Sequence, residues 1–222
     1  MFELIIIFTF FTSYIFGQDE TFDGTTEDYQ NLKFVCGTAS ITEQQKLESK
    51  AYVDSWLSGR ENRNEPVHVR IIFHIIHASN GQGDVSDSQI ESQVESMQDE
   101  FAEHQITFSL DSINRVENDD WFSGWYTENN DIQGMQQLSY DPYHFLNIYT
   151  ARLNEPGSNY FVGGYTYWPL QMSEGSYQQG FTLDYRCLPG ESQQWPKAAT
   201  HEAGHYFGLA HTFDSDCNAP DD

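Results

Sequence analysis

The segment from His201 to His211 constrains this chain most, since it reads His-Glu-Ala-Gly-His-Tyr-Phe-Gly-Leu-Ala-His. On an α-helix, residues four positions apart project from one face, about 6 Å apart along the axis. A helix over this segment therefore directs the imidazoles of His201 and His205 toward a shared point. Two imidazoles at this spacing are typical of a metal site, in which zinc takes nitrogen ligands at about 2.0–2.1 Å.

His211 is the candidate for a third metal ligand, but a continued helix would carry it about 240° round the axis from His205 and about 9 Å further along. The helix must therefore end between them. Gly208 stands where that end is needed, because glycine adopts the left-handed conformation that terminates helices. Glu202 projects about 100° from His201, beside the metal, where a general base for a zinc-activated water is expected. Such a pairing suits hydrolysis of a peptide bond.

Charge and hydrophobicity limit the possible partners and the compartment. Ten Lys and Arg stand against 34 Asp and Glu, for a net charge of −24, which opposes binding to nucleic acids and to anionic lipids. Residues 4–16 form an apolar run that is too short for a membrane span, which needs about 20 residues, but matches a signal-peptide core. We expect a signal peptide at 1–17, no membrane span and secretion to the extracellular space; the alternative is a buried N-terminal strand.

The hydrophobic pattern predicts an α+β domain with a mixed sheet. The predicted elements are a helix at 42–57, a strand at 67–76, a helix at 86–104, a strand at 106–110, strands at 145–151 and 163–168, and the helix that carries the motif. The acidic segment 111–131 is interpreted as an irregular surface region, and residues 18 to about 40 as a mobile start of the secreted form.

The chain has three cysteines, Cys36, Cys187 and Cys217, which is an odd number for a secreted protein. One of them therefore lacks a partner within this sequence. It could be a buried apolar residue, a metal ligand, or half of a disulfide bond to a cysteine outside this sequence.

The spacing His-Glu-x-x-His-x-x-Gly-x-x-His is the signature of the metzincin zinc endopeptidases, which the chain resembles. The flanking residues resemble those of the pappalysin family, the relatives of pregnancy-associated plasma protein-A. They are His211–Phe213, Cys217, Asn218–Asp221, Leu146–Tyr149, Gly163–Pro169 and Cys36–Thr38. The resemblance covers about residues 34–222 and implies a zincin-like catalytic domain with a mixed twisted sheet, a backing helix and an active-site helix.

The resemblance also implies a function for the motif. It implies a secreted zinc-dependent endopeptidase that acts on proteins or peptides, with one catalytic zinc held by His201, His205 and His211 and with Glu202 as the general base. Its edge strand, here 163–168, would pair with an extended substrate. An alternative function is a non-catalytic, secreted zinc-binding module that binds peptides or inhibitors without cutting them.

Latent precursors are common in such families, which predicts a pro-segment at 18–63 and a catalytic domain at 64–222. Cleavage near Arg60 or Arg63 would separate the two. Two interpretations of Cys36 stay open: a thiol that occupies the open zinc position until the pro-segment is removed, or a buried or oxidised cysteine. Calcium is a further expected ion, at a site that would begin with Asp214, Asp216, Asp221 and Asp222.

The lower part of a metzincin domain is not in this sequence. Metzincins place a methionine turn beneath the zinc, tens of residues after the third histidine, whereas all four methionines here precede the motif and only residues 212–222 follow His211. We therefore expect the chain to be C-terminally incomplete, as a fragment of a longer protein or as a truncated product. Cys217 favours the fragment, because in the family it pairs with a later cysteine.

Overall fold

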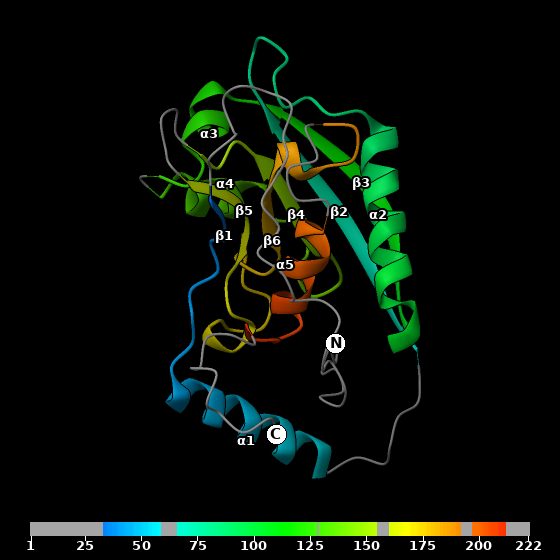
Figure 1. Ribbon diagram of the computed structural model, residues 1–222, viewed down its shortest axis with the longest axis vertical. Coiled ribbons are helices and arrows are strands. Elements are labelled where there is room, and N and C mark those ends of the chain that lie inside the picture. The colour runs from blue at the N-terminus through cyan, green and yellow to red at the C-terminus, as the bar shows by residue number, and fades with distance from the viewer. Residues whose placement is uncertain (1–32, 59–65, 128, 155–159, 192–196, 212–222) are drawn as a thin grey trace.

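A six-stranded mixed sheet forms the centre of the computed structural model, which describes residues 33–58, 66–127, 129–154, 160–191 and 197–211 (Figure 1). The strand order is β1-β5-β6-β4-β2-β3. Strand β5 runs antiparallel to β6, and the other neighbouring pairs are parallel. The strands are β1 (Lys33–Cys36), β2 (Val67–His77), β3 (Ile106–Glu117), β4 (Leu146–Ala151), β5 (Tyr160–Thr166) and β6 (Phe181–Asp184).

Helices cover both faces of the sheet. The α-helices are α1 (Glu43–Ser58), α2 (Asp87–Phe101), α3 (Asp119–Gly124), α4 (Asn130–Leu138) and α5 (Ala198–Tyr206), and the 3-10 turns are Ala102–His104, Pro169–Gln171 and Tyr185–Cys187. Successive residues of a strand face opposite sides. Gly164 of β5 lies against Glu202 of α5, whereas the next residue, Tyr165, donates its hydroxyl to Asp131 of α4. Helix α5 also packs against α2, so α2 and α5 share one face and α4 lies on the other.

Strand β2 is the central strand that its β-branched run predicts. It lies between β4 and β3, and the adjacent side chains of Ile75 and Ile76, which face opposite sides of the sheet, have no exposed surface. A strand that is covered on both faces needs a continuous apolar run rather than an alternating one. The prediction of a mixed sheet with a backing helix and an active-site helix is confirmed.

The interpretation of 111–131 as an irregular surface region is wrong. Strand β3 continues to Glu117, because Ser112–Glu117 pair with Ile72–His77 of β2. Helix α3 follows at once, and Trp125 is completely buried. Asp111, Glu117, Asp119 and Asp120 are exposed, whereas Phe122 and Trp125 enter the core. Asp131, at the end of the segment, is buried and accepts the hydroxyl of Tyr165.

The expectation of a mobile start up to residue 40 is wrong at its end. Residues Lys33–Cys36 form β1, which pairs with β5. The polar composition of residues 18–40 did not indicate this strand. Main-chain hydrogen bonds to β5 hold it, and these do not depend on an apolar pattern of side chains. Other expectations lie outside the described residues: the signal peptide at 1–17, cleavage at Arg60 or Arg63, Cys217, and the calcium site at Asp214, Asp216, Asp221 and Asp222. Within the described ranges, each helix is too short or too polar to cross a membrane.

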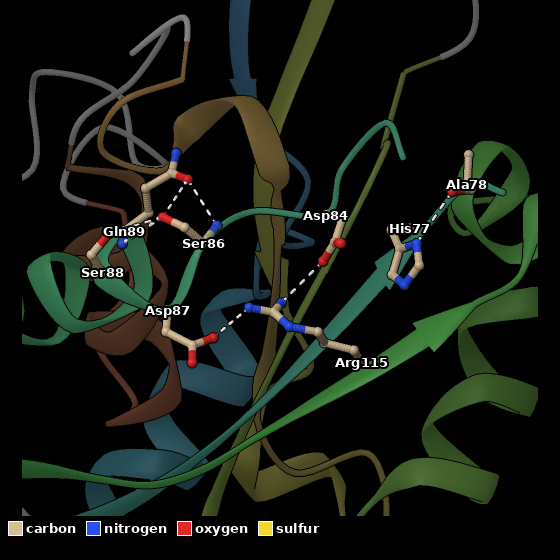
Figure 2. A network of polar contacts seen from close by, with 8 residues as sticks. All are labelled: His77, Ala78, Asp84, Ser86, Asp87, Ser88, Gln89 and Arg115. Atoms are coloured by element: carbon tan, nitrogen blue, oxygen red, sulfur yellow. Dashed lines mark hydrogen bonds and ion pairs between the residues drawn. The ribbon is translucent and has the colours of Figure 1, made fainter. Parts of the chain in front are cut away.

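Polar contacts fix the N-terminus of α2 against the sheet (Figure 2). Ser86 caps the helix: its hydroxyl accepts the backbone N–H of Gln89, and the Gln89 side chain accepts the backbone N–H of Ser86. Arg115 of β3 binds Asp84 at 3.1 Å and also contacts Asp87. These contacts set the start of the helix that backs the sheet.

Replacing Ser86 by Ala removes the cap acceptor and is expected to lower the free energy of unfolding by about 1 kcal/mol. Ser92→Ala, at an exposed position further along the same helix, is the matched control and should change it by less than about 0.5 kcal/mol. Urea unfolding curves of the two variants measure the difference. Equal effects would contradict the role of the capping box.

Candidate active site

Helix α5 carries the first two histidines of the motif and ends where the sequence requires it. His201 and His205 lie within Ala198–Tyr206, and the chain reverses at Gly208, whose φ is +90°. The N–H of Gly208 donates to the carbonyl of His205 at 2.8 Å, and the N–H of Leu209 donates to that of Gly204 at 2.9 Å. The predicted helix end at glycine is confirmed, and it returns the chain toward the helix face.

The three imidazoles of the motif meet at one point. The Nε2 atom of His205 lies 3.1 Å from that of His201 and 3.0 Å from that of His211, and the remaining pair is 3.3 Å apart. All three side chains are buried. Nδ1 of His205 lies 2.6 Å from the carbonyl oxygen of Leu209, a contact that requires the ring proton on Nδ1 and leaves a lone pair on Nε2.

Such a cluster suits a divalent cation. A tetrahedral ion with metal–nitrogen bonds of about 2.1 Å requires ligand nitrogens about 3.4 Å apart, close to the separations between the imidazoles. Burial, together with the neighbouring rings of His205 and His211, lowers the pKa of His201 to about 3. The imidazole is therefore held in the neutral form that binds metals.

Cys36 brings a fourth donor atom to the same point. Its Sγ lies 3.5 Å from Nε2 of His205, and the four ligand atoms of Cys36 and the three histidines lie within 4.8 Å of one another. A zinc ion with one sulfur ligand at about 2.3 Å requires a sulfur–nitrogen separation of about 3.6 Å. Burial, and then the negative charge of Glu202, raise the pKa of the Cys36 thiol. A thiolate at this place therefore needs a cation beside it.

Glu202 lies next to the imidazoles with its carboxylate completely buried. One oxygen, Oε1, accepts the thiol of Cys36 at 3.4 Å. The other, Oε2, accepts the hydroxyls of Thr38 and Thr166, each at 3.0 Å. Burial raises the pKa of Glu202 to about 7, against the opposing effect of these hydrogen bonds. A carboxyl with a pKa near neutrality can both accept and return a proton.

The position of Glu202 depends on a glycine in the sheet. A side chain at Gly164 would place its Cβ 2.8 Å from Cγ of Glu202 and 2.9 Å from the carbonyl oxygen of Thr182. Strand β5 therefore offers space at Gly164 and a hydroxyl two residues later at Thr166, on the same face. Thr38 joins them, since its hydroxyl accepts the backbone N–H of Thr166 at 2.8 Å.

The structure separates the motif histidines from the other described ones. His74 is buried, stacks on Tyr149 and is hydrogen-bonded to Asn147 and Asn114. His68 is exposed on β2. Thr38 and Thr166 are site residues that the sequence analysis did not single out. The period-two alternation in Gly163–Trp168 was a usable signal, because it places Thr166 on the same face as Gly164.

Known proteins share the sequence around this site. The family model of pregnancy-associated plasma protein-A matches residues 127–222. An extracellular metalloprotease of Podospora anserina is 30% identical over 207 residues, which cover 90% of this chain and 68% of that protein. Extracellular metalloprotease 1 of Coccidioides posadasii is 31% identical over 165 residues, which cover 71% of this chain and 56% of that protein.

The fold is shared with a solved structure. A mutant of promirolysin from Tannerella forsythia superposes with a TM-score of 0.61 at 17% identity, over 80% of this chain and 69% of that chain. At this identity the likeness concerns the fold alone. The aligned part of this chain spans 68% of the length of the Podospora protein and 56% of the length of the Coccidioides protein.

The imidazole cluster is expected to bind about one divalent ion per chain. His205→Ala removes the central nitrogen and leaves two imidazoles and the Cys36 sulfur, so retention of that ion should fall well below the wild-type content. His68→Ala, at the exposed histidine of β2, should retain the wild-type content. Metal analysis after gel filtration measures the difference. Equal content in the two variants would contradict the site.

Proposed function

We propose, on the premise that this chain belongs to the pregnancy-associated plasma protein-A family of metalloproteases, that it is the catalytic part of a secreted, zinc-dependent endopeptidase. One observation carries the proposal: three imidazole nitrogens meet beside a buried carboxylate on the same helix. The fungal relatives are named extracellular metalloproteases, which supports secretion.

The proposed metal is zinc, held by His201, His205 and His211. Buried neutral imidazoles in a tetrahedral arrangement favour zinc over calcium or magnesium, which prefer oxygen ligands. The approach of the Cys36 sulfur supports the same choice, because a mixed sulfur and nitrogen set is typical of zinc. The zinc ion would supply Lewis acidity, which lowers the pKa of a water and polarises the carbonyl of the peptide bond.

Glu202 is the proposed general base. Its carboxylate takes a proton from the attacking water and returns it to the nitrogen of the leaving amine, which needs a group that exchanges protons near neutral pH. Strand β5, at the side of the cluster, is the proposed edge for an extended substrate chain.

We propose that residues 18–63 are a pro-segment that keeps the enzyme latent. Three contacts support this role. Strand β1 occupies the edge of β5, Cys36 directs its sulfur at the imidazoles, and Thr38 donates to Glu202. The segment therefore covers the substrate edge, the open ligand position and the base together, and its removal would release all three.

Replacing Glu202 by Gln keeps the shape of the side chain but removes its ability to accept a proton. In the full-length protein, freed of residues up to 63, we expect kcat on a peptide substrate to fall by about 10²–10⁴-fold, with zinc content unchanged. Glu91→Gln, at an exposed position of α2, is the control and should leave kcat at the wild-type value. Full activity in Glu202→Gln would remove this residue from the mechanism. A wild-type protein that binds zinc but cleaves no peptide would favour the non-catalytic module.

Replacing Cys36 by Ala should raise the peptidase activity of the uncleaved precursor, because the fourth ligand position becomes accessible to water. The control is Tyr52→Phe, at an exposed position of α1, which should leave the precursor as inactive as the wild type. Alkylation of Cys36 by iodoacetamide should also be slower with zinc bound than after chelation. An alkylation rate of Cys36 that is the same with zinc bound and after chelation would contradict the role of the thiol.

A further inference from the structure

The carboxylate of Glu202 has hydrogen-bond donors from two different parts of the chain. Cys36 and Thr38 belong to the proposed pro-segment, whereas Thr166 is the last residue of β5. Removal of residues up to 63 would take the first two donors away. Of these three donors, Thr166 alone would remain beside Glu202 in the cleaved enzyme.

We propose that Thr166 is a positioning residue that orients the Glu202 carboxylate for proton transfer in the active enzyme. The inference rests on the proposed function of Glu202 as the base. In this role Thr166 holds the carboxylate of Glu202 and does not contact the substrate.

The contact has the geometry that this role needs. Oγ1 of Thr166 lies 3.0 Å from Oε2 of Glu202 and 3.1 Å from the main-chain oxygen of the same residue. A hydroxyl has one proton, and an ionised carboxylate is the stronger acceptor. The Thr166 hydroxyl therefore donates to the carboxylate, which restricts rotation of the Glu202 side chain.

The sheet makes Thr166 a rigid support. Its backbone pairs with Phe181 of β6, and its side chain is almost completely buried. A β-branched side chain in a strand has few accessible rotamers, so the hydroxyl keeps its direction. Gly164, on the same face two residues earlier, leaves the space that Glu202 occupies.

The expected effect is on the chemical step. A displaced base leaves the metal ligands and the substrate edge in place, so KM should stay near the wild-type value while kcat falls. Small displacements of a catalytic group cost up to about 100-fold in rate. The variant Thr166→Val keeps the shape and removes the hydroxyl, and Thr166→Ser keeps the hydroxyl.

The test compares these variants in the full-length protein loaded with zinc and freed of residues up to 63. Thr166→Val should lower kcat by about 10- to 100-fold with KM and zinc content unchanged, and Thr166→Ser should restore most of kcat. The control is Thr150→Val in β4, at a buried hydroxyl without a hydrogen-bond partner among the described residues. It should keep the wild-type kcat.

A second measurement tests the contact without activity. In the uncleaved precursor, the drop in melting temperature caused by Thr166→Val should be larger when Glu202 is present than in a Glu202→Ala background, because the two side chains are coupled. Equal drops would overturn the contact.

The role of Thr166 and the proposed peptidase function are tested by different kinetic results. A wild-type kcat in Thr166→Val, or a Thr166→Ser variant as slow as Thr166→Val, would show that the hydroxyl does not position the base. A cleaved wild type that hydrolyses no peptide would contradict the proposed function instead. The melting temperatures would then still decide whether Thr166 holds the carboxylate.

Discussion

Mutual repulsion between lone pairs is the constraint on which this site depends. Three buried imidazoles with their Nε2 atoms 3.0–3.3 Å apart cannot all present lone pairs to one another without a shared cation or proton. The helix must stop at Gly208 to bring His211 back, and the ring of His205 must be held by the carbonyl of Leu209. The end of α5 and the loop after it therefore serve the geometry of this cluster.

Burial of Glu202 is the second costly feature, because an ionised carboxylate out of water needs hydrogen bonds to offset its lost hydration. The chain meets this need from the sheet and from the N-terminal segment, through Thr166, Thr38 and Cys36. Helix α5 could not bury that carboxylate against β5 if position 164 carried a side chain. Strand β5 and helix α5 therefore fit together closely around Glu202.

The sequence predicted what depends on local spacing. The helix through His201 and His205, its end at Gly208, the long helix after residue 86 and the central strand at 67–76 follow from periodicity, and the structure and the comparisons confirm the fold and the family. The strand at 33–36 and helix α3 within 111–131 were missed, because the strand forms through pairing with β5 and the helix through burial of Trp125 in the core. The contact between Thr166 and Glu202 joins residues 36 positions apart, and no local pattern encodes it.

Strand β1 determines whether the edge of β5 is open to other strands. With β1 paired, both sides of β5 are hydrogen-bonded, to β1 and to β6. A protein that loses β1 gains an open sheet edge, and open edges attract other strands without regard to their origin. Removal of residues up to 63, as proposed, would therefore open β5 both to a substrate and to a strand from a second copy of this chain. With Lys33–Cys36 in place, β5 offers no free edge to such a strand.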